Sequence, residues 1–274
     1  MNPRRRLIVN ADDFGRSRSI NEAVIRAHQD GILTTASLMV NGAYADEAAA
    51  LARQNPRLGV GLHVSLICGT SALKPAEIPG LVDHAGNFSD RPVATGIRYY
   101  IRPGLRPQLE REIRAQFEKF QATGLALDHV NGHLHFHLHP VIFRILMKRA
   151  GDWGVHRFRL TRDLFGLNLR LASGHFFYRA SHALLFGMLA PPARQALRRL
   201  GIRHTQTVFG LLQNSRVDED YVSRLVPRLP PGDSELYSHP SLDEFRNEFV
   251  ALMSPRVRAL VREQGVELIR YCDL

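Results

Sequence analysis

Cysteine, long apolar runs and acidic charge are all scarce in this chain of 274 residues. Cys68 and Cys272 are too few for a disulfide-stapled secreted domain, so both are expected to be free thiols in a reducing compartment. No stretch reaches the ~20 apolar residues of a membrane-spanning helix. The start, MNPRRRLIVNADDFG, lacks the apolar run of roughly 7–15 residues that a signal peptide needs. These absences predict a cytoplasmic protein.

Basic residues outnumber acidic ones, 36 against 26, which gives a formal net charge of +10. This positive charge favours binding to nucleic acid or to an anionic membrane surface, or it reflects only a basic proteome. No nucleic-acid-binding motif and no aromatic-basic run accompany the charge, so we expect no nucleic-acid partner. The apolar fraction of 45% is ordinary for a globular protein, and a chain this long can bury a core without disulfides.

Short β-like runs alternate with helical patterns along the chain, which predicts an α/β fold with parallel strands covered by helices. The expected strands are 7–10, 33–40, 58–66, 126–130, 155–160, 207–211, 235–239 and 266–271, and the expected helices are 19–30, 44–54, 108–122, 140–150, 219–225 and 243–263. A Pro- and Gly-rich stretch over 69–104 is too long for a bare connection and is expected to be a functional loop or to carry small elements. One barrel domain over 1–274 is a common solution at this length.

Residues 165–200 differ from the rest because they are apolar and basic together. Two interpretations remain open. The segment can be a helical insertion that makes a peripheral contact with the inner face of the membrane, with its arginines toward anionic headgroups. It can equally be a buried helix pair with a solvated basic face.

Two adjacent carboxylates, Asp12 and Asp13, follow the first expected strand. Adjacent side chains on an extended backbone point opposite ways, but a turn at the end of the strand lets both reach one cavity. One carboxylate can then bind a metal while the other takes a proton from water. The alternative is a helix cap before 19–30, because Asp is a favoured N-cap residue.

Histidine is concentrated in one stretch: five of the 13 histidines lie within 129–139. Imidazole is the commonest metal ligand near neutral pH, and histidines at alternate positions share one side of an extended strand. The tract is interleaved with Leu and Phe, which favours an ordered site over a nonspecific metal-binding tract. A catalytic metal site uses about three protein ligands, so not all five histidines can bind.

His63 and His239 each end an expected strand, and Pro240 restricts the backbone of His239. His239 can protonate a leaving amine, although either histidine can instead be structural. All these clusters fall at the carboxyl ends of expected parallel strands. In α/β barrels the catalytic residues gather on that face.

Five motifs resemble those of the YdjC-like carbohydrate deacetylases, which include the diacetylchitobiose deacetylases. They are VNADDFG at 9–15, TTASLMVNG at 34–42, GLH at 61–63, GHLHFH at 132–137 and SHP at 238–240. The resemblance implies a deformed (β/α) barrel and one divalent metal held by Asp13, His63 and His133. It further implies that Asp12 is the base, that His239 belongs to the active site, and that Asn41, His135 and His137 touch substrate. Asn131 departs from the family, since many members have Asp there.

The resemblance implies hydrolysis of the acetamide of an N-acetylglucosamine-type sugar. Zn²⁺ is the first choice of metal because two histidines and a carboxylate suit it, with Mg²⁺ as the alternative. The run HVNGHLHFHLHP resembles the hopanoid-biosynthesis-associated members, which implies a glycolipid substrate. Soluble chitooligosaccharide deacetylation, a barrel metallo-phosphoesterase and a non-enzymatic metal- or membrane-binding protein are the alternatives.

Overall fold

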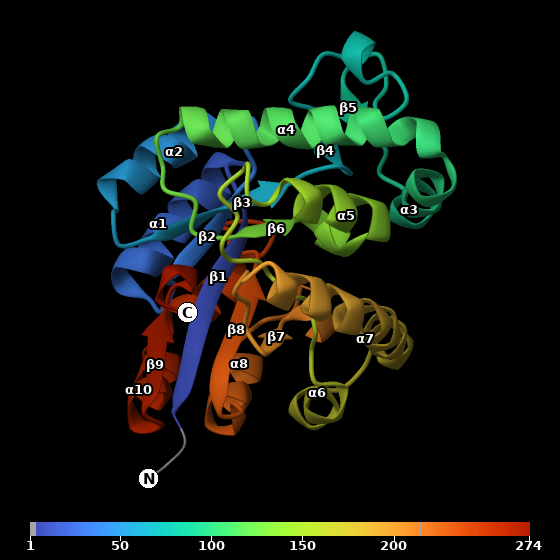
Figure 1. Ribbon diagram of the computed structural model, residues 1–274. Coiled ribbons are helices and arrows are strands. Elements are labelled where there is room, and N and C mark those ends of the chain that lie inside the picture. Colours follow the sequence, from blue (N-terminus) through green and yellow to red (C-terminus); the bar gives the residue numbers. More distant parts are fainter. Residues whose placement is uncertain (1–3, 214) are drawn as a thin grey trace.

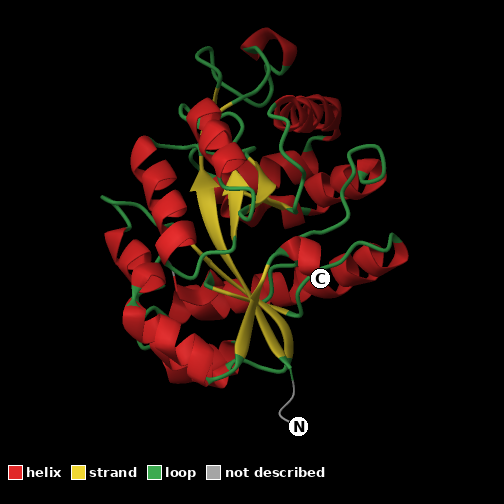
Figure 2. Cartoon of the chain, turned by 90° about the vertical axis from the view of Figure 1, so that its left-hand side faces the viewer, coloured by secondary structure: helices red, strands yellow, loops and turns green. Residues whose placement is uncertain are grey.

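A curled sheet of parallel strands forms the centre of the protein, which we describe from a computed structural model of residues 4–213 and 215–274. The strand order is β6-β3-β2-β1-β8-β7, and β9 also pairs with β1. The strands are β1 (Arg5–Phe14), β2 (Thr35–Leu38), β3 (Gly59–Val64), β6 (Val130–Gly132), β7 (Thr207–Phe209), β8 (Gly232–Ser238) and β9 (Val266–Ile269). The sheet curls into a half-barrel with helices around it (Figures 1 and 2), which confirms the expected α/β fold of deformed-barrel type.

Amphipathic helices cover the sheet. They are α1 (Arg18–Asp30), α2 (Ala45–Gln54), α4 (Arg106–Ala122), α5 (Pro140–Arg149), α8 (Glu219–Leu225), α9 (Arg246–Met253) and α10 (Pro255–Glu263). The single helix expected over 243–263 is wrong. It breaks at Ser254 because Pro255 disfavours a helical backbone in the residue before it. Ser254 instead is extended and caps α10 by accepting a hydrogen bond from the Val257 amide.

The stretch 69–104 carries small elements, which was one of the two expectations for it: the β4–β5 hairpin (Gly69–Thr70 and Asn87–Phe88) and the helix α3 (Pro92–Ile101). The strand expected over 155–160 forms only isolated bridges, from Phe158 to Val130 and from Arg157 to Arg203. This segment still runs parallel beside β6, so its residues reach the same edge of the sheet.

The apolar-basic segment 165–200 forms two helices, α6 (Phe165–Leu171) and α7 (Phe176–Arg199). Phe186, Ala190 and Leu197 of α7 are buried, whereas Phe177 and Leu184 are exposed. The buried-pair interpretation therefore explains only one face of α7. None of the helices within the described ranges has the length and apolar character needed to cross a membrane.

Candidate metal centre

The Asp12–Asp13 pair lies at the end of β1, where the backbone leaves the regular extended form. Asp13 has a left-handed φ of 64°, and the pairing of β1 with β2 slips between Ala11 and Phe14. The alternation of side chains is therefore interrupted. As a result both carboxylates meet one imidazole: Asp12 Oδ1 lies 4.0 Å from His63 Nδ1, and Asp13 Oδ1 lies 3.3 Å from His63 Nε2.

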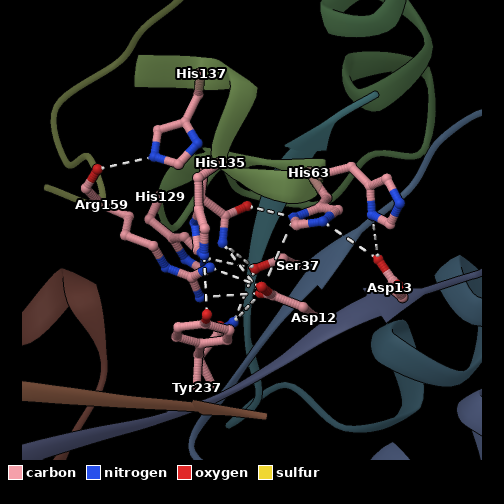
Figure 3. Close-up of polar contacts among 12 residues, drawn as sticks. Asp12, Asp13, Ser37, His63, His129, His135, His137, Arg159 and Tyr237 are labelled. Atoms are coloured by element: carbon pink, nitrogen blue, oxygen red, sulfur yellow. Dashed lines mark hydrogen bonds and ion pairs between the residues drawn. The ribbon is translucent and has the colours of Figure 1, made fainter. Parts of the chain in front are cut away.

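Asp13, His63 and His133 come from three separate segments and converge on one point. Figure 3 shows Asp13 beside the His63 imidazole. One potential ligand atom from each lies within 4.8 Å of the others, and Asp13 Oδ1 is 2.9 Å from His133 Nδ1. Burial disfavours the charge on Asp13, yet the two imidazoles hold its pKa well below the usual range. The same carboxylate, against the effect of burial, raises the pKa of His133 to about 10. A buried carboxylate between two imidazoles is a donor set that can hold a divalent cation.

Asn131 orients the metal-facing imidazole of His63. Its Oδ1 lies 2.7 Å from His63 Nδ1, while its Nδ2 donates to Ser37 Oγ at 2.8 Å and to Asp12 Oδ1 at 3.2 Å. A carboxylate such as Asp12 only accepts, so the amide nitrogen must face it and the amide oxygen must face His63. His63 then carries its proton on Nδ1 and presents the lone pair of Nε2 toward Asp13.

These two contacts of Asn131 can be separated by mutation. Asn131→Ala removes the acceptor for His63 and is expected to weaken the binding of a divalent metal about 10–100-fold. Asn131→Asp keeps that acceptor, so metal binding should persist. Competition with a chromogenic chelator, with zinc as the probe, measures the affinity of both variants. Equal zinc affinity in the wild type and Asn131→Ala would contradict the role of Asn131.

Arg159 is the largest fully buried side chain and holds the other carboxylate, Asp12. Its two terminal nitrogens contact Asp12 at 2.7 and 2.9 Å, and it also contacts Glu235 Oε1 at 2.6 Å. Burial opposes the charge on Asp12, but Arg159 holds its pKa well below the ordinary value. The sequence analysis missed Arg159 and Glu235. A charged residue between the apolar Phe158 and Leu160 of an expected strand was the signal.

The histidine tract does not have the extended form expected from its alternation. Residues His133–Leu138 form a short 3₁₀ segment, η3, and Leu134 and His135 have positive φ values of 48° and 58°. The imidazoles therefore point to different places (Figure 3). His133 faces Asp13, whereas His135 lies 2.9 Å from the Tyr237 hydroxyl.

The remaining members of the tract have structural partners. His137 is fully buried with Nε2 3.1 Å from the carbonyl of Arg159, which leaves no surface for the substrate contact expected from the sequence. Burial, aided by Arg159, lowers the pKa of His137 to about 3. His129 is also buried, between Asp128 and Ser37. His129 and His137 therefore hold neighbouring residues in position.

His239 follows β8 and is held by Glu248, which lies on α9. Glu248 Oε2 is 3.7 Å from His239 Nδ1 and accepts the His239 backbone N–H at 2.5 Å. Burial would lower the pKa of His239, but Glu248 outweighs it and raises that pKa to about 9. Sequence reasoning proposed His239 and gave no indication of Glu248, which is distant along the expected helix.

Asn41 follows β2, the strand that pairs with β1. Its Nδ2 is 3.4 Å from Glu112 Oε1, and its Oδ1 has no hydrogen-bond partner among the described residues. Glu112 is fully buried and also accepts the backbone amides of Ala72 and Leu73. Asn41 therefore retains an unused acceptor beside a loop that Glu112 fixes.

A cavity of about 490 Å³ is lined by residues of α6 and α7. Its apolar lining comes from Leu164, Phe165, Leu167, Ala183, Phe186 and Leu211, and Arg162 and Asp163 line it as well. Phe186 also packs edge-on against His135, with ring centroids 5.3 Å apart. The cavity therefore lies one side chain away from His135.

Sequence comparison finds similarity to curated carbohydrate deacetylases. A carbohydrate deacetylase of Brevibacillus brevis is 39% identical over 150 residues, covering 55% of this chain and 57% of that protein. One from Thermoanaerobacter pseudethanolicus is 25% identical and covers 98% of both chains. This chain thus spans little more than half the length of the first of these curated relatives.

Fold and family extend over nearly the whole chain. The crystal structure of a putative cellobiose-phosphate cleavage protein from Enterococcus faecalis superposes with a TM-score of 0.76 at 20% identity, over 98% of each chain. The profile of the YdjC-like proteins matches residues 6–263. With five motifs in order along one α/β sheet and three of them meeting at one buried centre, the chain belongs to the YdjC-like protein family.

Proposed function

We propose that this protein is a metal-dependent hydrolase that removes the N-acetyl group from an N-acetylglucosamine-type sugar. The observation that carries the proposal is the convergence of Asp13, His63 and His133, with Asp12 beside them. The names of the relatives, carbohydrate deacetylase and chitooligosaccharide deacetylase, support the same chemistry. Zn²⁺ fits the two imidazoles and one carboxylate best, and Mg²⁺ is the alternative.

The residues of the site have separate roles in the proposed reaction. A divalent metal bound by the three ligands would polarise the acetyl carbonyl and make water more acidic. Asp12, kept anionic and fixed in orientation by Arg159, accepts the proton of the attacking water. His239, protonated through Glu248, donates a proton to the departing sugar amine. Asn41 and His135 contact the sugar from either side.

The proposed acid role of His239 predicts a pH effect. Since the pKa of His239 is raised to about 9, its acidic form is lost as the pH rises through that value, and kcat should fall there. Glu248→Gln removes the charge that raises this pKa, so the alkaline limb of kcat should move to lower pH. Glu244→Gln, on the exposed turn before α9, is the control. An unmoved alkaline limb in Glu248→Gln would exclude His239 as the acid.

The substrate we propose is a glycolipid of hopanoid type, and peripheral membrane contact by residues 165–200 is part of the proposal. The apolar cavity beside His135 supports it, because an aglycone attached to the sugar needs such a surface. A soluble chitooligosaccharide is the alternative, supported by the names of the relatives.

Acetate release measures the proposed function. N-acetylglucosamine conjugates with and without an apolar aglycone, and soluble diacetylchitobiose, are each incubated with the zinc-loaded protein and with protein treated with a chelator. We expect zinc-dependent acetate release that is fastest with the apolar conjugate. Equal rates on diacetylchitobiose would exclude the glycolipid, and no acetate release would exclude the deacetylase.

A metallo-phosphoesterase is tested on the same samples with a phosphate ester. The described residues contain one three-ligand cluster, whereas phosphoesterases of this kind usually hold two metals about 3.5–4 Å apart. Phosphate release without acetate release would favour that alternative.

A further inference from the structure

Two segments of the chain carry all of its net positive charge. Residues 91–109 and 164–217 contain 11 of the 36 basic residues and none of the 26 acidic ones. The remainder of the chain has 25 basic and 26 acidic residues and is nearly neutral. The two segments contain α3, and α6 with α7, respectively. A basic proteome alone would not confine the excess to two stretches.

The same two segments expose most of the large apolar side chains. Of the fourteen such residues in the described chain, eleven lie on α3, α6, α7 or η3: Val93, Ile97, Tyr100, Ile101, Leu134, Leu169, Phe176, Phe177, Leu184, Leu185 and Met188. Val93 and Phe177 are 75% and 88% exposed. Val93, Ile97 and Tyr100 share one face of α3 at helical spacing. Phe177, Leu184 and Met188 likewise share one face of α7.

The two helices that carry these apolar faces contact the two ends of the histidine tract, which includes the candidate ligand His133. On one side, the carbonyl of Gly96 in α3 lies 3.0 Å from His139 Nε2, just after η3. On the other side, Phe186 of α7 packs on His135 of η3. Leu134, beside the ligand His133, is 49% exposed between them. Figure 1 shows α3, α5 and α7 on the same side of the molecule, with α3 beside the end of α5 and α7 below it.

We propose that these eleven residues and the flanking arginines form one docking surface for an anionic phospholipid bilayer. Aromatic and aliphatic side chains on an amphipathic helix enter the boundary between headgroups and acyl chains, and arginine pairs with the phosphates. Neither segment contains a carboxylate, so no negative charge within them repels the anionic headgroups. A second copy of the chain seated here would bring arginines against arginines, and nucleic acid offers nothing for the exposed Phe and Leu side chains.

Docking in this orientation sets the metal centre at the lipid interface. If the proposed deacetylation of a glycolipid holds, its sugar can enter the centre while its apolar part stays in the bilayer. The docking surface itself does not depend on that activity, because lipid binding and catalysis are measured separately.

Flotation with vesicles tests the docking surface. The zinc-loaded full chain is mixed with phosphatidylcholine vesicles that contain about one third phosphatidylglycerol, or none. We expect binding to the anionic vesicles that weakens with salt and is much weaker on pure phosphatidylcholine. Val93→Ser with Ile97→Ser on α3, and separately Phe177→Ser with Leu184→Ser on α7, should each weaken binding about tenfold or more.

The controls separate this surface from other causes. Val250→Ser removes an exposed apolar residue of α9 and should leave binding unchanged. Both double variants should keep acetate release from soluble diacetylchitobiose and the thermal midpoint of the wild type. If only the α7 variant lost vesicle binding, α3 would not be part of the docking surface. If the wild type did not bind anionic vesicles, the proposal would be wrong. A change of oligomeric state in either variant would assign the surface to a second copy instead.

Discussion

Replacing Asp12 by Asn is expected to lower kcat by about 10²–10⁴-fold, the range that a positioned general base contributes. The amide cannot accept the proton of water, whereas Asp13, His63 and His133 remain to bind metal. Zinc content by atomic absorption should therefore stay at the wild-type level. Acetate release under saturating substrate measures the effect.

A matched control is Asp233→Asn, since Asp233 also pairs with an arginine, Arg6, but at the amino end of β8. Its kcat should equal that of the wild type. Wild-type kcat in Asp12→Asn with full zinc content would remove Asp12 from the mechanism. Loss of zinc together with activity would instead assign Asp12 to the support of the metal ligands.

Replacing Arg159 by Met is expected to cost about 3–5 kcal/mol in the free energy of unfolding, because it leaves Asp12 and Glu235 as buried charges without their cation. Catalysis should fall as well, since Asp12 loses the bidentate contact that orients it. Urea denaturation monitored by circular dichroism gives the stability. Arg157→Met, two residues earlier and only half-buried, should change it by about 0.5 kcal/mol or less.

A double-mutant cycle isolates the ion pair from the size of the side chain. Asp12→Asn combined with Arg159→Met should be less destabilising than the sum of the single variants, because the second change removes a charge that the first left unpaired. Additive losses would show that Arg159 stabilises the fold through its other contacts, namely the ion pair with Glu235 or the Tyr237 ring that its guanidinium covers at 4.6 Å.

Local signals in the sequence were sufficient for the fold class, whereas the candidate metal ligands came from the resemblance to the family. Strand and helix periods repeat along the chain, and Asp13, His63 and His133 each follow an apolar run. Parallel strands place their carboxyl ends at one edge, so residues far apart in sequence were expected to meet there. The helix over 219–225 has the expected bounds because Asp218 caps its first turn.

The same reasoning failed where the backbone is irregular. The histidine tract alternates as a strand would, yet positive φ values at Leu134 and His135 turn it into η3 and send each imidazole to a different partner. Hydrophobic period carries no information on such turns. The break at Ser254 is visible in the sequence as the following proline, whereas the loss of a regular strand over 155–160 depends on neighbours far away in the chain.

The sequence by itself determined the α/β architecture and the family, because those depend on residue types at short spacing and on motifs in order along the chain. Only the tertiary structure decided which groups orient the candidate site residues. Arg159 holds Asp12, Asn131 contacts His63, and Glu248 contacts His239. The tertiary structure also placed α3 and α7 against the two ends of η3, through Gly96 beside His139 and Phe186 on His135. Contacts of this kind join residues many positions apart, and buried charges find partners wherever the chain packs, which no local pattern records.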